Sequence, residues 1–206
     1  MNKYQNKYRI PSARLQNWDY GAMGSYFVTI CTQNREHFFG EIVSKTPCNV
    51  ETHRNVETHC NVETHCNASL QQNEMILNDI GKKVEEEWLK TIAIRPDMNL
   101  ELGNFVVMPN HFHGILIIGK NEFNLDTDIK NQFGPQSKNL GSIIRGFKSA
   151  VTTYSRKDAI HHVSTINFGW QPRFHDHIIR NSLEFDRIQN YIANNVENWN
   201  KDKFYK

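Results

Sequence analysis

The sequence has no long run of apolar residues, and this absence limits the classes of protein to which the chain can belong. Its longest aliphatic run covers residues 115–118, whereas a helix that crosses a bilayer needs about 20 apolar residues. Residues 1–8 are polar and aromatic and do not form the hydrophobic core of a secretory signal. We therefore expect a cytoplasmic protein that has no membrane partner.

Cysteine is also scarce, and the net charge is small. The 206 residues include four cysteines, too few for a disulfide framework in a domain of this size, so we expect reduced thiols. A net charge of +2 does not by itself indicate a nucleic-acid partner. With 38% hydrophobic residues, the length suits one well-packed domain, and we expect residues 1–206 to form it.

One segment differs from the rest because it is repetitive. Three near-identical hexapeptides occupy residues 48–53, 54–59 and 60–65, and a broken fourth follows. Each carries one valine, which is too little apolar surface for a core. A Cys/His metal tract is an alternative, but the spacing is that of the repeat and matches no zinc motif. We predict a low-complexity insertion at about residues 46–72, without a function of its own.

Basic residues are concentrated in two parts of the sequence. Before the first acid, Asp19, cations alternate with aromatic residues: Lys3, Tyr4, Lys7, Tyr8, Arg9, Arg14 and Trp18. Residues 138–180 contain seven Lys or Arg and two Asp. Such a distribution is typical of a solvated face, and it also suits a polynucleotide, whose phosphates bind cations and whose unpaired bases stack on rings.

Apolar periodicity predicts the secondary structure. Strands are expected at 24–32, 100–107, 112–118 and just before residue 180, with a short strand or hairpin arm at 37–42. Helices are expected at 78–90, 140–154 and from about 181 to 199. The order strand, helix, strand, strand, helix, strand, helix is that of the α+β ferredoxin-like fold, a split βαβ arrangement. We therefore predict an antiparallel sheet with helices on one face, plus a C-terminal helix.

The first candidate site is a His-x-His pair at the start of a strand. Because successive strand side chains point to opposite faces, His111 and His113 lie on one face and Phe112 on the other. Two imidazoles in this arrangement can converge on one metal ion. Pro109 and Asn110 before them suit a tight turn. Two strand histidines without a ligand remain an alternative.

The second candidate is on the last predicted helix, where Tyr191 and Asn195 have the i, i+4 spacing of one helix face. Tyr191 is equally compatible with a core aromatic position. A phenol, with a pKa near ~10, is a poor nucleophile, but a divalent ion can withdraw charge from a phosphate under attack. Two histidines with one amide or carboxylate would hold such an ion and leave positions open.

Several motifs in this order resemble the HUH-class single-strand DNA transposases, most closely the REP-associated tyrosine transposases. The resemblance covers nearly the whole chain outside the repeat. It is carried by Tyr-Phe-Val-Thr at 26–29, Val-Met-Pro-Asn-His-Phe-His at 107–113, Phe-Lys at 147–148, Trp-Gln-Pro-Arg-Phe at 170–174, and Tyr-Ile at 191–192 with Asn195 and Trp199.

The resemblance implies roles for particular residues. His111 and His113 would be the HUH metal ligands, Asn195 the third ligand and Tyr191 the nucleophile. Members of the family bind imperfect DNA hairpins, cut the single strand beside them, hold a 5′-phosphotyrosine and release a 3′-hydroxyl. The ion is Mg²⁺ or Mn²⁺, and no nucleotide cofactor is needed.

Three cations are candidates for phosphate contacts around that centre: Arg145, Lys148 and Arg173. The basic N-terminal arm is a candidate for binding the hairpin. Each of these side chains could instead be an ordinary solvated cation. The sequence leaves open whether the protein acts as a monomer or a homodimer.

The chain departs from the family pattern at Val196, where related sequences commonly have proline after the asparagine. Valine lets the helix continue, so Asn194 is a rival ligand, and Tyr154 on the preceding helix is a rival nucleophile. Two other functions remain open. One is a non-catalytic nucleic-acid-binding module of ferredoxin-like fold. The other is a histidine phosphodiesterase, with a second motif at residues 162–164.

Overall fold

The fold was derived from a computed structural model that describes residues 3–4, 7–8, 15, 18–45, 72–125, 137–161 and 168–205. The hexapeptide repeat and the possible phosphodiesterase motif at 162–164 lie outside these residues. In the described part of the chain, no helix combines the length and apolar content needed to span a membrane.

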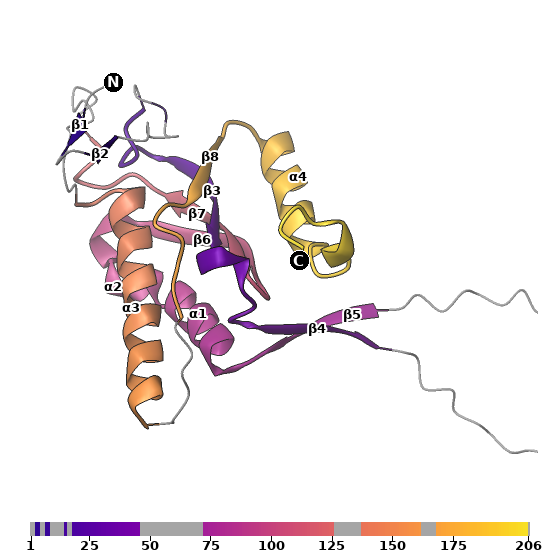
Figure 1. Ribbon diagram of the computed structural model, residues 1–206. Coiled ribbons are helices and arrows are strands. Elements are labelled where there is room, and N and C mark those ends of the chain that lie inside the picture. The colour runs from indigo at the N-terminus through magenta and orange to yellow at the C-terminus, as the bar shows by residue number, and fades with distance from the viewer. Residues whose placement is uncertain are drawn as a thin grey trace, which may run out of the picture.

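The centre of the structure is a four-stranded sheet (Figure 1). Its strands are β3 (Gly24–Cys31), β6 (Leu100–Met108), β7 (His111–Ile118) and β8 (His175–Ile179), in the order β6-β7-β3-β8. All three neighbouring pairs are antiparallel. This order places β3 and β7, the first and third strands of the split βαβ motif, at the centre of the sheet. The predicted ferredoxin-like fold is therefore confirmed.

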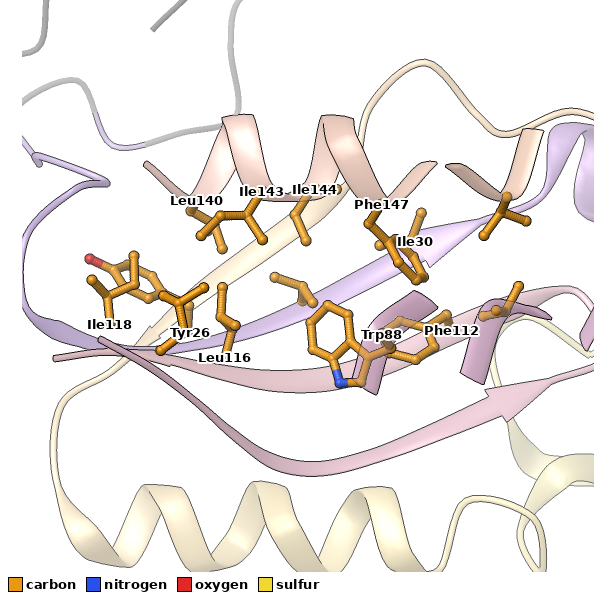
Figure 2. Close-up of a cluster of buried hydrophobic side chains, with 14 of the residues drawn as sticks. Tyr26, Ile30, Trp88, Phe112, Leu116, Ile118, Leu140, Ile143, Ile144 and Phe147 are labelled. Atoms are coloured by element: carbon orange, nitrogen blue, oxygen red, sulfur yellow. The ribbon is translucent and has the colours of Figure 1, made fainter. Parts of the chain in front are cut away.

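One face of the sheet carries the main hydrophobic core. It is covered by α1 (Asp79–Leu89) and α3 (Leu140–His161), and the short α2 (Thr91–Ile94) follows α1. In Figure 2 apolar side chains of α3 point toward the sheet and meet a layer that includes the ring of Trp88. The labelled members of this core are Tyr26, Ile30, Trp88, Phe112, Leu116, Ile118, Leu140, Ile143, Ile144 and Phe147.

Gly114 is required for this packing. A Cβ atom built on Gly114 would lie 2.8 Å from Cζ2 of Trp88 and 2.9 Å from Cε1 of Phe112, closer than side-chain carbons pack. The glycine therefore lets Trp88 lie directly against β7, beside the strand position that carries His113.

The opposite face is covered in part by α4 (Ser182–Ala193), which lies over β6 and β7. Asn181 caps the helix by accepting a hydrogen bond from the backbone of Glu184. A second apolar cluster fixes the helix to the sheet: Ile115, Ile179, Ile188 and Ile192. The helix ends at Ala193 rather than near Trp199 as the sequence had suggested, and residues 194–198 form turns.

A second, two-stranded sheet projects from the body of the molecule (Figure 1). It pairs β4 (Gly40–Lys45) with β5 (Gln72–Leu77), and its far end leads into the repeat segment. The sequence predicted only the first of these two strands, and placed it at residues 37–42. Remaining elements are β1 (Lys3–Tyr4), β2 (Lys7–Tyr8) and the 3-10 turns η1 (Gln33–Arg35), η2 (Pro96–Met98) and η3 (Trp199–Lys201).

Candidate functional site

The two histidines of the His-x-His pair lie at the start of β7, on the face of the sheet that α4 covers. His111 is opposite Cys31 of β3, and His113 is opposite Thr29. Both side chains are buried, with 0% and 1% of their surfaces exposed, and their ring centroids are 4.5 Å apart. The strand alternation therefore brings the two imidazoles together as the sequence predicted.

The hydrogen bonds of Asn110 determine which nitrogen of His111 carries the proton. The amide nitrogen of Asn110 donates to the backbone carbonyls of Arg35 and Phe204, at 3.2 and 2.8 Å. Its amide oxygen therefore faces Nδ1 of His111, 2.9 Å away, and Nδ1 must be the donor because that oxygen can only accept. Nε2 keeps its lone pair, is buried, and has no hydrogen-bond partner.

His113 is held between β3 and α4. Its Nδ1 lies 2.9 Å from Oγ1 of Thr29, and its Nε2 lies 3.3 Å from the hydroxyl of Tyr191. The ring stacks on Phe27, with a centroid distance of 5.2 Å. Tyr191 occurs at the margin of the buried face of α4 and is 43% exposed, so its hydroxyl reaches both the histidines and the solvent side of the site.

Asn195 follows α4 in the turn and reaches the same place. Its side chain is 3% exposed, and its Oδ1 atom is buried without a hydrogen-bond partner. A buried amide oxygen without a partner is costly. Asn195 thus reaches the site from the turn that follows α4. The sequence had placed it there by assuming that the helix continues to this residue.

Sequence reasoning missed one member of the site, Asp202. Ligand atoms of His111, His113 and Asp202 lie within 4.8 Å of one another. The Asp202 carboxylate accepts hydrogen bonds from the Tyr191 hydroxyl, at 3.5 Å, and from Nδ2 of Asn195, at 3.4 Å. Asp202 lies after η3 and has no spacing pattern relative to Tyr191 that a helix or strand would produce.

Burial controls the protonation of the histidines. Removal from water lowers the pKa of His111 to about 3, with smaller contributions from the cations Lys203 and Arg35. The pKa of His113 is likewise well below its usual value, chiefly because of burial. Both imidazoles are therefore neutral at neutral pH, which is the form that binds metals.

The pKa of Tyr191 shifts the other way. Burial raises it above 10, and the nearby negative charge of Asp202 raises it further. The hydroxyl is therefore protonated at neutral pH, and any nucleophilic role would need a neighbouring proton acceptor and an activated electrophile.

The donor set fits a divalent cation. His111 offers an unpartnered nitrogen, Asn195 an unpartnered oxygen, and Asp202 a carboxylate beside His113. Two imidazoles with oxygen ligands suit Mn²⁺ and also other first-row ions. The second hydrogen bond of each imidazole, to Asn110 or Thr29, orients its ring as in known metal sites.

The two rival residues lie elsewhere. Tyr154 is on α3, on the opposite face of the sheet, where Nζ of Lys83 lies 5.5 Å from its ring centroid. The side chain of Asn194 is exposed and donates to the carbonyl of Asn190. Neither side chain is part of the site.

The three predicted phosphate contacts do not form one cluster around the site. Arg145 is exposed on α3, behind the sheet as seen from the histidines, and Arg173 is exposed just before β8. Lys148 is half-buried and donates to the carbonyl of Gln171, and burial lowers its pKa to about 8. Their contacts with DNA remain predictions.

Comparisons with known proteins give the class of the fold and one relative. The structure aligns with that of a REP-associated tyrosine transposase bound to a REP hairpin, with a TM-score of 0.50 at 16% identity, over 94% of this chain and 77% of that chain. The sequence resemblance to this class is thus confirmed at the level of the fold. No family model matches the sequence.

The second comparison is with a relative in sequence. An uncharacterized protein of Haemophilus influenzae is 32% identical over 200 residues, which cover 94% of this chain and 92% of the relative. The chain belongs to the same family as this Haemophilus protein.

Proposed function

We propose that the protein is a transposase of the HUH tyrosine class, a metal-dependent endonuclease and strand transferase acting on single-stranded DNA. The observation that carries the proposal is the convergence of His111, His113, Asn195 and Tyr191 from two distant segments on one buried point. The fold, shared with a REP-associated tyrosine transposase bound to a REP hairpin, supports it. By that likeness the substrate is hairpin DNA.

The proposed metal ligands are His111, His113 and Asn195. Their available atoms are Nε2 of each imidazole and Oδ1 of the amide, two of which are buried without partners. A divalent ion, Mg²⁺ or Mn²⁺, would supply Lewis-acid polarisation of the scissile phosphate. The nearby side chains Phe27 and Phe204 exclude water from the imidazoles.

Tyr191 is the proposed nucleophile. Its oxygen would attack phosphorus while the bond from phosphorus to the 3′ oxygen breaks, so that a 5′-phosphotyrosine forms and a 3′-hydroxyl is released. The phenol proton needs an acceptor, and Asp202 is suitably placed because its carboxylate already accepts a hydrogen bond from the phenol. Attack by another 3′-hydroxyl reverses the reaction and joins the strands.

A second candidate function is a non-catalytic nucleic-acid-binding protein of the same fold. The specific observation that favours it is the raised pKa of Tyr191. A phenol that holds its proton is a poor nucleophile unless a metal ion is bound at the site and the phosphate is positioned beside it. Such a protein would bind hairpins without cutting them.

The test is incubation of the full chain with single-stranded hairpin DNA labelled at the 5′ end or, separately, at the 3′ end, in Mn²⁺ or EDTA. We expect a metal-dependent protein adduct on the fragment with the 3′ label, absent with Tyr191→Phe and retained with Tyr154→Phe. Binding of the hairpins without any adduct in Mn²⁺ would support the binding protein instead.

A further inference from the structure

A second His-x-His pair lies on β8, the edge strand of the sheet that leads directly into α4 (Figure 1). His175 pairs with Thr29 of β3, and His177 pairs with Phe27. Directly opposed residues of an antiparallel ladder project from the same face, and Thr29 also pairs with His113. The second pair therefore shares a face of the sheet with the candidate site, although neither of its histidines has a part in the proposed reaction.

Both of these histidines are accessible. α4 lies over β6 and β7 rather than over β8, so this end of the face stays open to solvent. The side chain of His177 is 53% exposed, and His175 is exposed as well. Among the described residues, none forms a hydrogen bond or an ion pair with His175. Its imidazole therefore keeps its full capacity to bind a ligand.

Glu184, in the first turn of α4, supplies a carboxylate next to this pair. Its Oε1 atom lies 2.8 Å from Nε2 of His177, and its Oε2 atom accepts a hydrogen bond from the backbone nitrogen of Arg180, at 3.0 Å. The backbone bond from Arg180, and then the contact with His177, lower the pKa of Glu184, so its carboxylate is ionised at neutral pH. Arg187 reaches Oε1 at 3.5 Å, but its side chain is 75% exposed, and an ion can displace it.

These three side chains have the donor set of a transition-metal site. Residues two apart on a strand are separated by about 7 Å, and His175 can turn about its side-chain torsions to direct a nitrogen toward the carboxylate. The 2.8 Å between Nε2 of His177 and Oε1 of Glu184 is close to the ~3.0–3.4 Å between ligands whose bonds to zinc are ~2.1 Å long. An ion would take the place of the proton between them.

The ligand types select the ion. Two imidazoles with one carboxylate, and a position left for water, are typical of Zn²⁺. Mg²⁺ prefers oxygen ligands and keeps its waters, so it competes poorly at such a site. The chemistry therefore favours zinc over the ions expected at the first site.

The two sites are too far apart to share one ion. Thr29 lies between His113 and His175 in the sheet, and its hydroxyl contacts Nδ1 of His113. Two strand spacings of about 4.8 Å place the backbones of these histidines about 10 Å apart. An ion on β8 is therefore separate from an ion held by His111 and His113.

We propose that His175, His177 and Glu184 bind a Zn²⁺ ion that clamps the start of α4 to β8. Because two ligands belong to the strand and one to the helix, the ion joins the two elements directly. Tyr191 follows Glu184 by seven residues, or about 10 Å along the helix axis, so the clamp restrains the helix that carries it. The inference goes beyond the proposed function, since it requires neither DNA nor strand cleavage.

The experiment measures how fast each histidine is acylated. Full-length protein is treated with diethyl pyrocarbonate while a chelator buffer fixes the free Zn²⁺ concentration, and tryptic peptides are quantified by mass spectrometry. Peptide 174–180 contains both histidines of the site, and peptide 36–45 contains the exposed His37 as an internal reference. We expect acylation of peptide 174–180 to slow about tenfold at ten times the Kd of Zn²⁺, with His37 unaffected and Mg²⁺ without effect.

Variants assign the ligands and test the clamp. His175→Gln should remove most of the protection of His177, and Glu184→Gln should weaken it. Glu101→Gln, which replaces an exposed acid on β6, is the matched control and should keep it. Amide hydrogen exchange over residues 182–193 should slow with Zn²⁺ in the wild type but not in His175→Gln.

Two results would overturn the inference. Equal acylation of peptide 174–180 with and without Zn²⁺, or protection that survives both His175→Gln and Glu184→Gln, would refute the metal site. Protection without slower exchange in α4 would refute the clamp. Neither result bears on the DNA adduct formed in Mn²⁺, so the proposed function stands or falls by its own test.

Discussion

The hydroxyl of Tyr191 lies 3.3 Å from Nε2 of His113, although 78 residues separate the two in sequence. This nitrogen is the atom that His113 would offer to a metal. Metal binding at Nε2 would therefore replace its contact with the phenol. Loading the site would leave Asp202 as the hydrogen-bond partner of the phenol, which prepares the hydroxyl to lose its proton.

The first prediction concerns the metal. We expect Mn²⁺ to raise the melting temperature of the protein, because an ion that binds only the folded state stabilises it by about 2.7 kcal/mol at 100 times its Kd. Asn195→Ala should reduce this shift strongly, since it removes a buried oxygen without a partner. Asn194→Ala is the matched control and should keep the shift. Differential scanning fluorimetry with and without Mn²⁺ makes the comparison, and equal shifts in the two variants would count against Asn195 as a ligand.

The second prediction separates Asp202 from the ligands. Asp202→Asn preserves the shape of the side chain but is a much weaker proton acceptor. We expect adduct formation to slow by about 10²-fold or more, while the shift in melting temperature with Mn²⁺ persists. If the Mn²⁺ shift disappears as well, Asp202 is a ligand rather than the partner of the phenol.

The third prediction is a loss of stability in mild acid. The pKa of His111 is about 3 in the folded protein and near ~6.5 in an unfolded chain. The unfolded state thus binds the proton first, and stability falls as the pH drops below 6.5, by up to about 1.4 kcal/mol per pH unit for this residue. Urea unfolding of metal-free protein at pH 7, 6 and 5 measures the slope.

A variant and a control isolate the contribution of His111. The free energy of unfolding of His111→Asn should depend less steeply on pH than that of the wild type. The difference should correspond to the uptake of about one proton on unfolding. His175→Gln, which replaces an exposed histidine on β8, should retain the wild-type slope. Identical slopes for wild type and His111→Asn would mean that His111 is not held neutral by burial.

The fourth prediction concerns stability at alkaline pH. Burial lowers the pKa of Lys148 to about 8, below the value near ~10.4 of an unfolded lysine. Between these values the unfolded state holds the extra proton, so this residue makes the protein more stable as the pH rises. One proton gives a slope of at most about 1.4 kcal/mol per pH unit, and solvent screening of this half-buried side chain makes the total gain smaller. Urea unfolding at pH 7.5, 8.5 and 9.5 should show this gain in wild type and a smaller one in Lys148→Met; parallel curves would contradict the shift.

The sequence predicted those parts of the fold that local patterns encode. Alternation in β7 placed His111 and His113 on one face, and the helical period of α4 placed Tyr191 near its buried side. The pairing of β5 with β4 was not predicted, because Gln72–Leu77 is short, begins with polar residues and adjoins the repeat.

The same reasoning explains what was missed at the site. The i, i+4 rule requires a continuous helix, whereas α4 ends at Ala193 and Asn195 reaches the site from the following turn. Asp202 is placed by the turns at 194–198 and by η3, which fold the chain back over the histidines. Tertiary packing of that kind leaves no periodic signal in the sequence.

The most direct test of the account is to identify the residue to which the DNA is attached. Wild-type protein is incubated with hairpin DNA in Mn²⁺, the adduct is digested with protease and nuclease, and the nucleotide-linked peptide is sequenced by mass spectrometry. We expect a nucleotide joined through its 5′ phosphate to Tyr191. A nucleotide on Tyr154 or on any other residue, or a cleaved strand with no linked peptide, would contradict the proposed mechanism.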